Sequence, residues 1–394
     1  MVKKIVLGVL LLVVLYFAGG IGLLALGKIN RLYFLPGWSI KGPHSVSDFS
    51  GVAADGPLVV SEGGRLISKR IVPSGNSLLV QTDTLRPDGR DTLTCFVQET
   101  KREFRVPLRR TPDSLAVEAT EYPAPAKWLA LSDIEGNFKG FESLLRGAGV
   151  VDQHLAWQFG KGHLVLVGDF FDRGLNVTEC LWLIYKLEQE AKQAGGKVHF
   201  ILGNHERMNL TGHYKYVRRK YRANADTLGI PYENWYDRST VLGQWLRTKN
   251  VVERIGGVLF VHGGISPAVA TQRLSLNRLN ALARASIDTP VAQLSAQERQ
   301  ATQPPSSPDW YRGLVFEEAE EAEVAQILAA YSASTMVVGH TPVERIKPLY
   351  HGKVIAIDLP HQELTDKGQP LHALLMENGK LRVLDSQGRS SAVQ

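Results

Sequence analysis

The segment Gly168-Asp169-Phe170-Phe171-Asp172-Arg173-Gly174 is the most informative part of this sequence. It directly follows the apolar run 164–167, which has the length and composition of a buried strand. Ligands of α/β sheets bind outside the carboxyl ends of the strands, and glycine allows the sharp backbone turns needed there. The segment therefore predicts a strand that ends in a metal or phosphate site.

Four more apolar runs end in clusters of the same kind. The runs are 128–132, 198–202, 258–261 and 335–338. The metal-ligand residue types that follow them are Asp133, Glu135, Asn204, His205, His262 and His340. Helix-like segments at 141–147 and 178–194 lie between the runs, and this alternation predicts an α/β layered fold.

The residue types in these clusters indicate hydrolysis of a phosphate ester. Carboxylate and amide oxygens combined with imidazoles suit manganese, iron or zinc. Two such ions close together can hold phosphate oxygens and activate a water molecule for in-line attack. A neighbouring arginine can bind the phosphate through two hydrogen bonds.

The order and spacing of the clusters resemble those of the calcineurin-like metallophosphoesterases, and within them the phosphoprotein phosphatases. The segments that carry the resemblance are 168–174, 203–206, 261–264 and 338–341. The segments 204–217 and 310–313 are similar to the Shewanella-like bacterial protein phosphatases. The resemblance covers residues 126–360 and implies a layered β-sandwich flanked by helices, with a metal-activated hydroxide as the nucleophile.

The resemblance also implies a role for each residue of the clusters. Asp133 would bind the first metal ion, and Asp169 would bridge both ions. The residues that would complete the second position are Asn204, His262 and His340. The residues expected to act on the phosphate are His205 as general acid, Asp172 as its orienting carboxylate, and Arg173 and Arg312 as phosphate ligands.

Glu135 departs from the family pattern, which has histidine two residues after the first aspartate. A ligating Glu135 would make the first position all-oxygen, which favours manganese, magnesium or ferric iron over zinc. Alternatively Glu135 does not ligate, and the first position is weak or empty. We expect ligation and two divalent or trivalent ions, with manganese favoured over iron and zinc.

The remainder of the chain divides into three segments of different character. Residues 1–27 contain Lys3-Lys4 and then an uncharged apolar run at 5–26, which is long enough for a single membrane-spanning helix. We expect an uncleaved anchor with the catalytic domain on the periplasmic or extracytoplasmic side. Residues 28–56 form a linker, 57–122 a small β-rich subdomain, and 123–394 the catalytic domain.

Composition excludes some classes of protein. The net charge of +6 in 394 residues is modest and includes no long basic stripe, so we expect no nucleic-acid partner. Cys95 and Cys180 are the only cysteines, which rules out a disulfide framework.

Several alternatives remain open. The aromatic residues between 214 and 236 would form a helical cap or line a pocket for an aromatic phosphoester. The substrate would be a phosphoprotein or a small phosphoester, or a phosphoanhydride of the diadenosine polyphosphate type. Another hypothesis is that the protein is a non-catalytic receptor for a phosphorylated ligand.

Overall fold

The computed structural model describes residues 13, 16–21, 31–35, 38–41, 51–86, 91–109 and 116–393. It separates into two compact units, Met1–Gly51 and Val52–Gln394. In the first unit, β1 (Arg31–Leu35) pairs antiparallel with β2 (Trp38–Lys41). All residues of the predicted clusters lie in the second unit.

The predicted membrane anchor at 1–27 falls mostly outside the described residues, which include only 13 and 16–21 of it. Within the part of the chain that the structure describes, no helix is both long and apolar enough to cross a bilayer. The anchor therefore stays a prediction.

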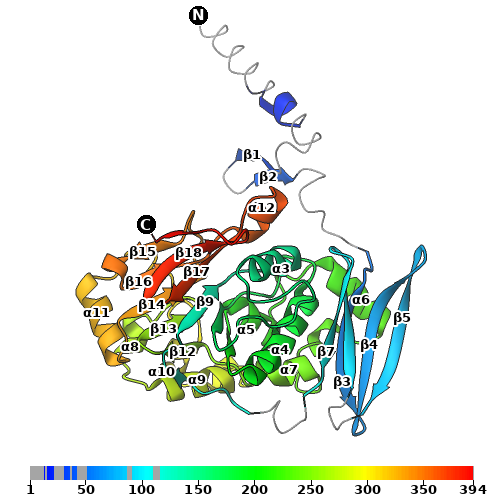
Figure 1. Cartoon of the computed structure of the whole chain (residues 1–394), viewed down its shortest axis with the longest axis horizontal. Helices are drawn as coiled ribbons and strands as arrows, with labels where there is room; N and C mark the ends of the chain where they lie inside the picture. Colours follow the sequence, from blue (N-terminus) through cyan, green and yellow to red (C-terminus); the bar gives the residue numbers. More distant parts are fainter. Residues whose placement is uncertain are drawn as a thin grey trace, which may run out of the picture. The chain divides into compact units, whose positions relative to one another are not determined.

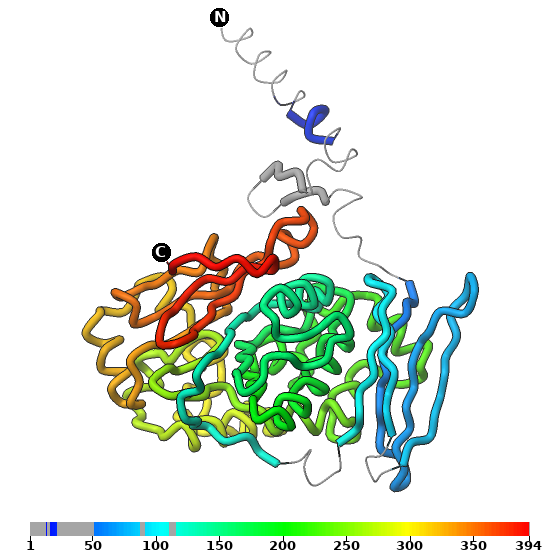
Figure 2. The backbone as a smooth tube through the Cα atoms, viewed as in Figure 1, coloured from blue at the N-terminus to red at the C-terminus, as the bar shows by residue number. Residues whose placement is uncertain are grey.

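The second unit contains two six-stranded mixed sheets. The first consists, in order across the sheet, of β11 (Lys197–Ile201), β10 (His163–Val167), β9 (Lys127–Leu131), β17 (His372–Glu377), β18 (Lys380–Asp385) and β19 (Ser390–Ala392). Strands β9, β10 and β11 are parallel, and β17 is antiparallel to β9. Figure 2 shows the C-terminal residues in red beside the chain that follows residue 126.

The second sheet has the same mixed character. Its order is β15 (Lys347–Leu349), β16 (Val354–Ala356), β14 (Thr335–Val338), β13 (Val258–Val261), β12 (Val252–Ile255) and β8 (Glu121–Tyr122). Strands β13, β14 and β16 are parallel. Because β8 pairs with β12, the last two residues of the predicted β-rich segment belong to this sheet.

The two sheets pack face to face with their own apolar core. On β9, Trp128 and Ala130 lie in the core between the sheets, and the Trp128 ring meets Phe260 of β13 edge-on at 5.1 Å. The alternate residues Leu129 and Leu131 lie in the other core, which the helices cover. This period of two is what a strand buried on both faces requires, and it confirms the predicted α/β layered fold.

Helices connect the strands and cover the sandwich (Figure 1). The crossovers from β9 to β10 and from β10 to β11 contain α3 (Phe138–Gly147) and α4 (Val177–Gln193). The other α-helices described in the second unit are α5 (Asn204–Leu210), α6 (Arg219–Leu228), α7 (Val241–Leu246), α8 (Pro267–Ala270), α9 (Leu276–Ala285), α10 (Ala296–Thr302), α11 (Glu321–Ala330) and α12 (His361–Asp366).

The β-rich segment packs on this fold. Its strands are β3 (Asp55–Glu62), β4 (Arg65–Ser74) and β5 (Ser77–Leu85) in one antiparallel sheet, and β6 (Thr92–Val97) and β7 (Arg102–Pro107) in another. The indole Nε1 of Trp182 in α4 donates to the carbonyl oxygen of Pro57 in β3 at 2.7 Å. Cys95 and Cys180 are both buried free thiols.

Candidate active site

The parallel strands bring the predicted clusters to one end of the sandwich. Asp133, Asp169 and Asn204 follow β9, β10 and β11, which run in the same direction in adjacent positions. His262 and His340 follow β13 and β14, which are also parallel neighbours. The five clusters therefore come from both sheets and meet at the carboxyl ends of these strands.

The backbone at this end is unusually constrained. Six site residues have a positive φ, namely Asp133, Glu135, Asp169, Asp172, Arg173 and His340. Aspartate and histidine tolerate this region better than most residues. Gly203 is required for a different reason, because a Cβ there would lie 2.3 Å from Oδ1 of Asp169. The turn before α5 therefore lies directly against the Asp169 carboxylate.

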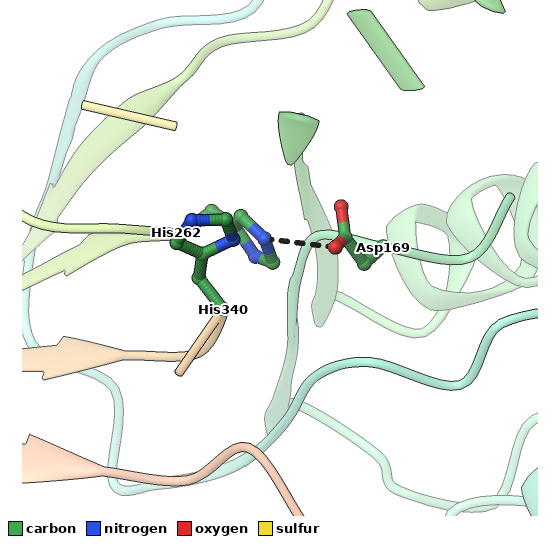
Figure 3. Close-up of side chains that lie close together, drawn as sticks. All are labelled: Asp169, His262 and His340. Carbon is green, nitrogen blue, oxygen red and sulfur yellow. Dashed lines mark ion pairs between the residues drawn. The ribbon is translucent and has the colours of Figure 1, made fainter. Parts of the chain in front are cut away.

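Asp169, His262 and His340 form a buried group that can hold a metal ion (Figure 3). Their ligand atoms all lie within 4.8 Å of one another. Nδ1 of His262 lies 2.7 Å from the carbonyl oxygen of Val167, which can only accept. The Nδ1 atom therefore carries a proton, and Nε2 faces Asp169 Oδ2 at 3.1 Å.

Two further observations fit a metal at this position. Oδ1 of Asn204 lies 3.1 Å from the same Nε2 atom of His262. Nε2 of His340 is buried and has no hydrogen-bond partner among the described residues. A buried nitrogen without a partner beside a carboxylate and a second imidazole is a donor set that manganese, iron or zinc accepts.

The charged groups at this position shift one another's pKa values. Burial alone would lower the pKa of His262, but the carboxylates of Asp169 and Asp133 raise it to about 10. Burial and the neighbouring His262 lower the pKa of His340 to about 2, so its imidazole is neutral. Burial opposes ionisation of Asp169, but His262 and His205 outweigh it and lower its pKa. A metal ion would replace the proton that His262 otherwise carries.

Asp133 and Glu135 lie at the edge of this group. Oδ2 of Asp133 accepts a hydrogen bond from the backbone N–H of His340 at 3.2 Å. Glu135 instead contacts the guanidinium of Arg173. Burial raises the pKa of Glu135 to about 8 despite this contact. Because the carboxylate of Glu135 lies against Arg173, its role as a metal ligand stays a prediction.

His205 has the surroundings of a general acid. Its Nδ1 lies 2.6 Å from Oδ2 of Asp172. Burial would lower the pKa of His205, but Asp169 and Asp172 outweigh it and raise the pKa to about 9. A protonated imidazole is therefore maintained at neutral pH.

A cavity of about 290 Å³ opens beside these groups. Its lining includes His205, Arg173 and Arg312, together with the carboxylates of Asp133 and Asp169. The side chain of Arg173 is 52% exposed, and its Nη2 lies 3.4 Å from Nε2 of His205. A phosphate in this cavity would therefore meet two guanidinium groups and one imidazolium.

Asp358 was not predicted from the sequence, although it lines the same cavity. It is 5% exposed, and burial together with Asp133 raises its pKa to about 9. A signal was present, because Asp358 follows the short apolar run 354–357 as Asp133 and Asp169 follow theirs.

The structural role of Glu206 was also not predicted. Its buried carboxylate accepts hydrogen bonds from four backbone N–H groups, those of Asp169, Phe170, Phe171 and Gly203. These bonds fix the loop after β10 to the start of α5, and so place Asp169 and His205 relative to each other.

Glu206→Gln should destabilise the protein by about 2–4 kcal/mol, because an amide N–H₂ would replace an oxygen that accepts from buried donors. Urea unfolding of the metal-free protein measures this loss. Glu363→Gln, the same change on the exposed surface of α12, is the control. A loss below about 0.5 kcal/mol for Glu206→Gln would show that the loop does not depend on this carboxylate.

The family follows from this arrangement and from comparison with known proteins. The family model for calcineurin-like phosphoesterases matches residues 126–344, which is more than half of the chain. The chain therefore belongs to the calcineurin-like phosphoesterases and is a hydrolase of phosphate esters.

Individual proteins that resemble this chain include two phosphoprotein phosphatases and a nucleotide hydrolase. The chain is 28% identical over 262 residues to the Shewanella-like protein phosphatase 1 of Plasmodium berghei, covering 62% of this chain and 69% of the relative. It is similar to the crystal structure of a cold-active protein-tyrosine phosphatase of a psychrophilic Shewanella species, with a TM-score of 0.77 and 34% identity. That match covers 87% of this chain and 100% of the other. Over 139 residues, it is 31% identical to a symmetrical bis(5'-nucleosyl)-tetraphosphatase of Methylococcus capsulatus, covering 35% of this chain and 43% of the relative.

Proposed function

We propose that this protein is a phosphoprotein phosphatase that transfers the phosphoryl group of a phosphorylated side chain to water. The observation that carries the proposal is the convergence of the His205–Asp172 pair, Arg173 and Arg312 on the cavity beside the metal-binding group. A protein that only binds a phosphorylated ligand has no need of a positioned general acid.

Different residues of the chain bind the phosphate and protonate the leaving oxygen. Two bound ions, with manganese favoured, would neutralise the phosphate oxygens and lower the pKa of the attacking water. Arg173 and Arg312 hold the remaining phosphate oxygens in line with that water. As the new P–O bond forms and the ester P–O bond breaks, His205 gives its proton to the leaving oxygen. The products are inorganic phosphate and the free hydroxyl of the substrate.

We propose phosphotyrosine as the preferred substrate residue. The ring of Tyr216 lies 5.1 Å from the ring of His205, and the guanidinium of Arg173 lies 5.5 Å from the same tyrosine ring. An aromatic side chain beside the general acid can pack against a substrate ring. The similar Shewanella structure, a protein-tyrosine phosphatase, supports this choice.

Four other aromatic residues of this region do not offer such a surface. Tyr221, Tyr232, Trp235 and Tyr236 are buried. They pack against one another, with Tyr232 in contact with the other three. This packing supports the cap interpretation for these four, and leaves the pocket interpretation to the half-buried Tyr214 and Tyr216.

The relative that cleaves bis-nucleosyl tetraphosphates makes a phosphoanhydride the second candidate substrate. Such a substrate carries several phosphates beyond the one attacked. Among the described residues, the cavity lining contains Arg173 and Arg312 and no other arginine or lysine. Both are assigned to a single phosphate, which favours a phosphomonoester.

The test uses the full chain in detergent, stripped of metal and resupplied with manganese. Phosphate release is compared for a phosphotyrosine peptide, the matching phosphoserine peptide and a bis-nucleosyl tetraphosphate. We expect manganese-dependent turnover that is fastest with phosphotyrosine. Faster turnover of the tetraphosphate would favour the second candidate. Binding of phosphate without turnover of any substrate would favour the receptor.

We also propose that the apolar run at 5–26 anchors the protein in a membrane, with the catalytic unit on the extracytoplasmic side. Protease treatment of spheroplasts, before and after their membrane is permeabilised, distinguishes the two sides. Digestion of the catalytic unit in spheroplasts supports this orientation, and protection until the membrane is permeabilised contradicts it.

A further inference from the structure

The carboxylate of Asp358 is buried and has no partner among the described residues. Asp358 is 5% exposed, and no hydrogen bond or ion pair joins its side chain to any of the described residues. Most other buried carboxylates among the described residues are paired, as Asp309 is with Arg207 at 2.9 Å; the buried Glu179 is an exception. An unpaired buried carboxylate is costly unless a cation compensates it.

The fold places Asp358 beside His340. In the parallel pair β14 and β16, Val338 is in register with Ala356, and His340 and Asp358 each lie two residues further along. Backbone hydrogen bonds from Ile357 to Val338 and from Val343 to Asp358 keep the two segments together beyond the strands. Asp358 is therefore at the same end of the sandwich as the metal-binding group.

Asp358 lines the same cavity as the residues that are expected to bind the first metal ion. Asp133, Glu135, Asp169 and Asp358 all contribute to its lining. The backbone N–H of His340 donates to Asp133, which ties Asp133 to the segment beside Asp358. Among the described residues, Glu135 is the only one of the four carboxylates that contacts a guanidinium.

We propose that Asp358 is a ligand of the first metal ion and takes the place that Glu135 would otherwise fill. Glu135 then serves to hold Arg173 at the cavity. The first position consists of the carboxylates of Asp133, Asp169 and Asp358, and so contains only oxygen ligands. Such a position selects manganese, magnesium or ferric iron over zinc. The inference rests on the proposed function, because it presumes a two-metal centre.

Manganese binding to Asp358→Asn and to Glu135→Gln tests the assignment. We expect the wild-type chain and Glu135→Gln to bind two manganese ions, counted by equilibrium dialysis. Asp358→Asn should lose at least about tenfold in affinity at one of the two positions, and Asp133→Asn should show the same loss. The electron paramagnetic resonance spectrum of manganese-loaded Asp358→Asn should be that of an isolated ion, whereas the wild-type spectrum should be that of a coupled ion pair. Glu363→Gln is the matched control, because Glu363 lines the same cavity but is exposed.

A melting temperature measured with and without manganese separates a ligand from a structural residue. As a ligand without protein partners, Asp358 should leave the metal-free melting temperature unchanged or higher when replaced by asparagine, and the rise on adding manganese should shrink. If Asp358→Asn binds two ions with wild-type affinity, the assignment of Asp358 as a metal ligand is wrong, but the proposed function stands. A wild-type chain that binds no pair of ions would overturn the proposed function itself.

Discussion

Asp169→Asn is expected to reduce phosphate release by at least about a thousandfold. The two oxygens of Asp169 have separate tasks, because Oδ1 accepts from the backbone N–H of His205 at 2.9 Å and Oδ2 faces His262 at 3.1 Å. An amide group cannot serve as an anionic ligand between two ions. Losing the stabilisation that the metal ions give to the charge of the transition state raises the activation free energy by several kcal/mol. A rise of about 4 kcal/mol corresponds to a thousandfold fall in rate.

The measurement is initial turnover of a phosphotyrosine peptide in saturating manganese, with the bound metal counted on the same sample. Asp226→Asn, the same change on the exposed surface of α6, should keep full activity and both ions. Circular dichroism shows whether Asp169→Asn is folded. A folded variant that retains more than a tenth of the wild-type rate would contradict a bridging role for Asp169.

His205→Asn should slow the enzyme by a factor that depends on the leaving group. A general acid contributes about 10²–10⁴-fold when the leaving oxygen must be protonated. Hydrolysis of a phosphoserine peptide, whose alkoxide leaves poorly, should therefore fall by about that factor. Hydrolysis of p-nitrophenyl phosphate, whose phenolate leaves without a proton, should fall much less. An equal loss with both substrates would mean that His205 acts in binding and not as an acid.

The pH dependence gives an independent test of the same residue. His205 acts while protonated, so activity should be complete below its pKa and decline as the pH rises through about 9. Asp172→Asn removes a carboxylate that raises this pKa, so the alkaline limb should move to lower pH. Asp226→Asn should leave the limb in place. An unchanged limb in Asp172→Asn would assign it to another group.

Long apolar runs made the central strands predictable from the sequence. Strands β9, β10, β11, β13 and β14 lie within one residue of the predicted runs, because each is buried on both faces and is almost uniformly apolar. Strand β4 contains Ser68, Lys69 and Arg70. Strand β18 is exposed over its first three residues. Neither has a continuous apolar run, so their pairing partners and not their own composition make them strands.

Site residues could be found from the sequence when they stand in a short motif together with glycine. Asp133, Asp169 and Asn204 are found in this way, and the structure brings them together with His262 and His340. Asp358 has no glycine beside it, and its place depends on the register of β16 against β14. The contact of Glu135 with Arg173 depends on side-chain geometry between two loops, which spacing along the chain does not determine.

The positive φ angles at the site limit how far this protein can be made heat-resistant. Each residue held in that region costs about 1–2 kcal/mol relative to a relaxed backbone. Replacing Glu135 or Arg173 by glycine would relieve the strain but would remove a group from the cavity. Substitutions that raise the melting temperature without loss of rate should therefore be sought away from these loops, for example on the exposed strand β5.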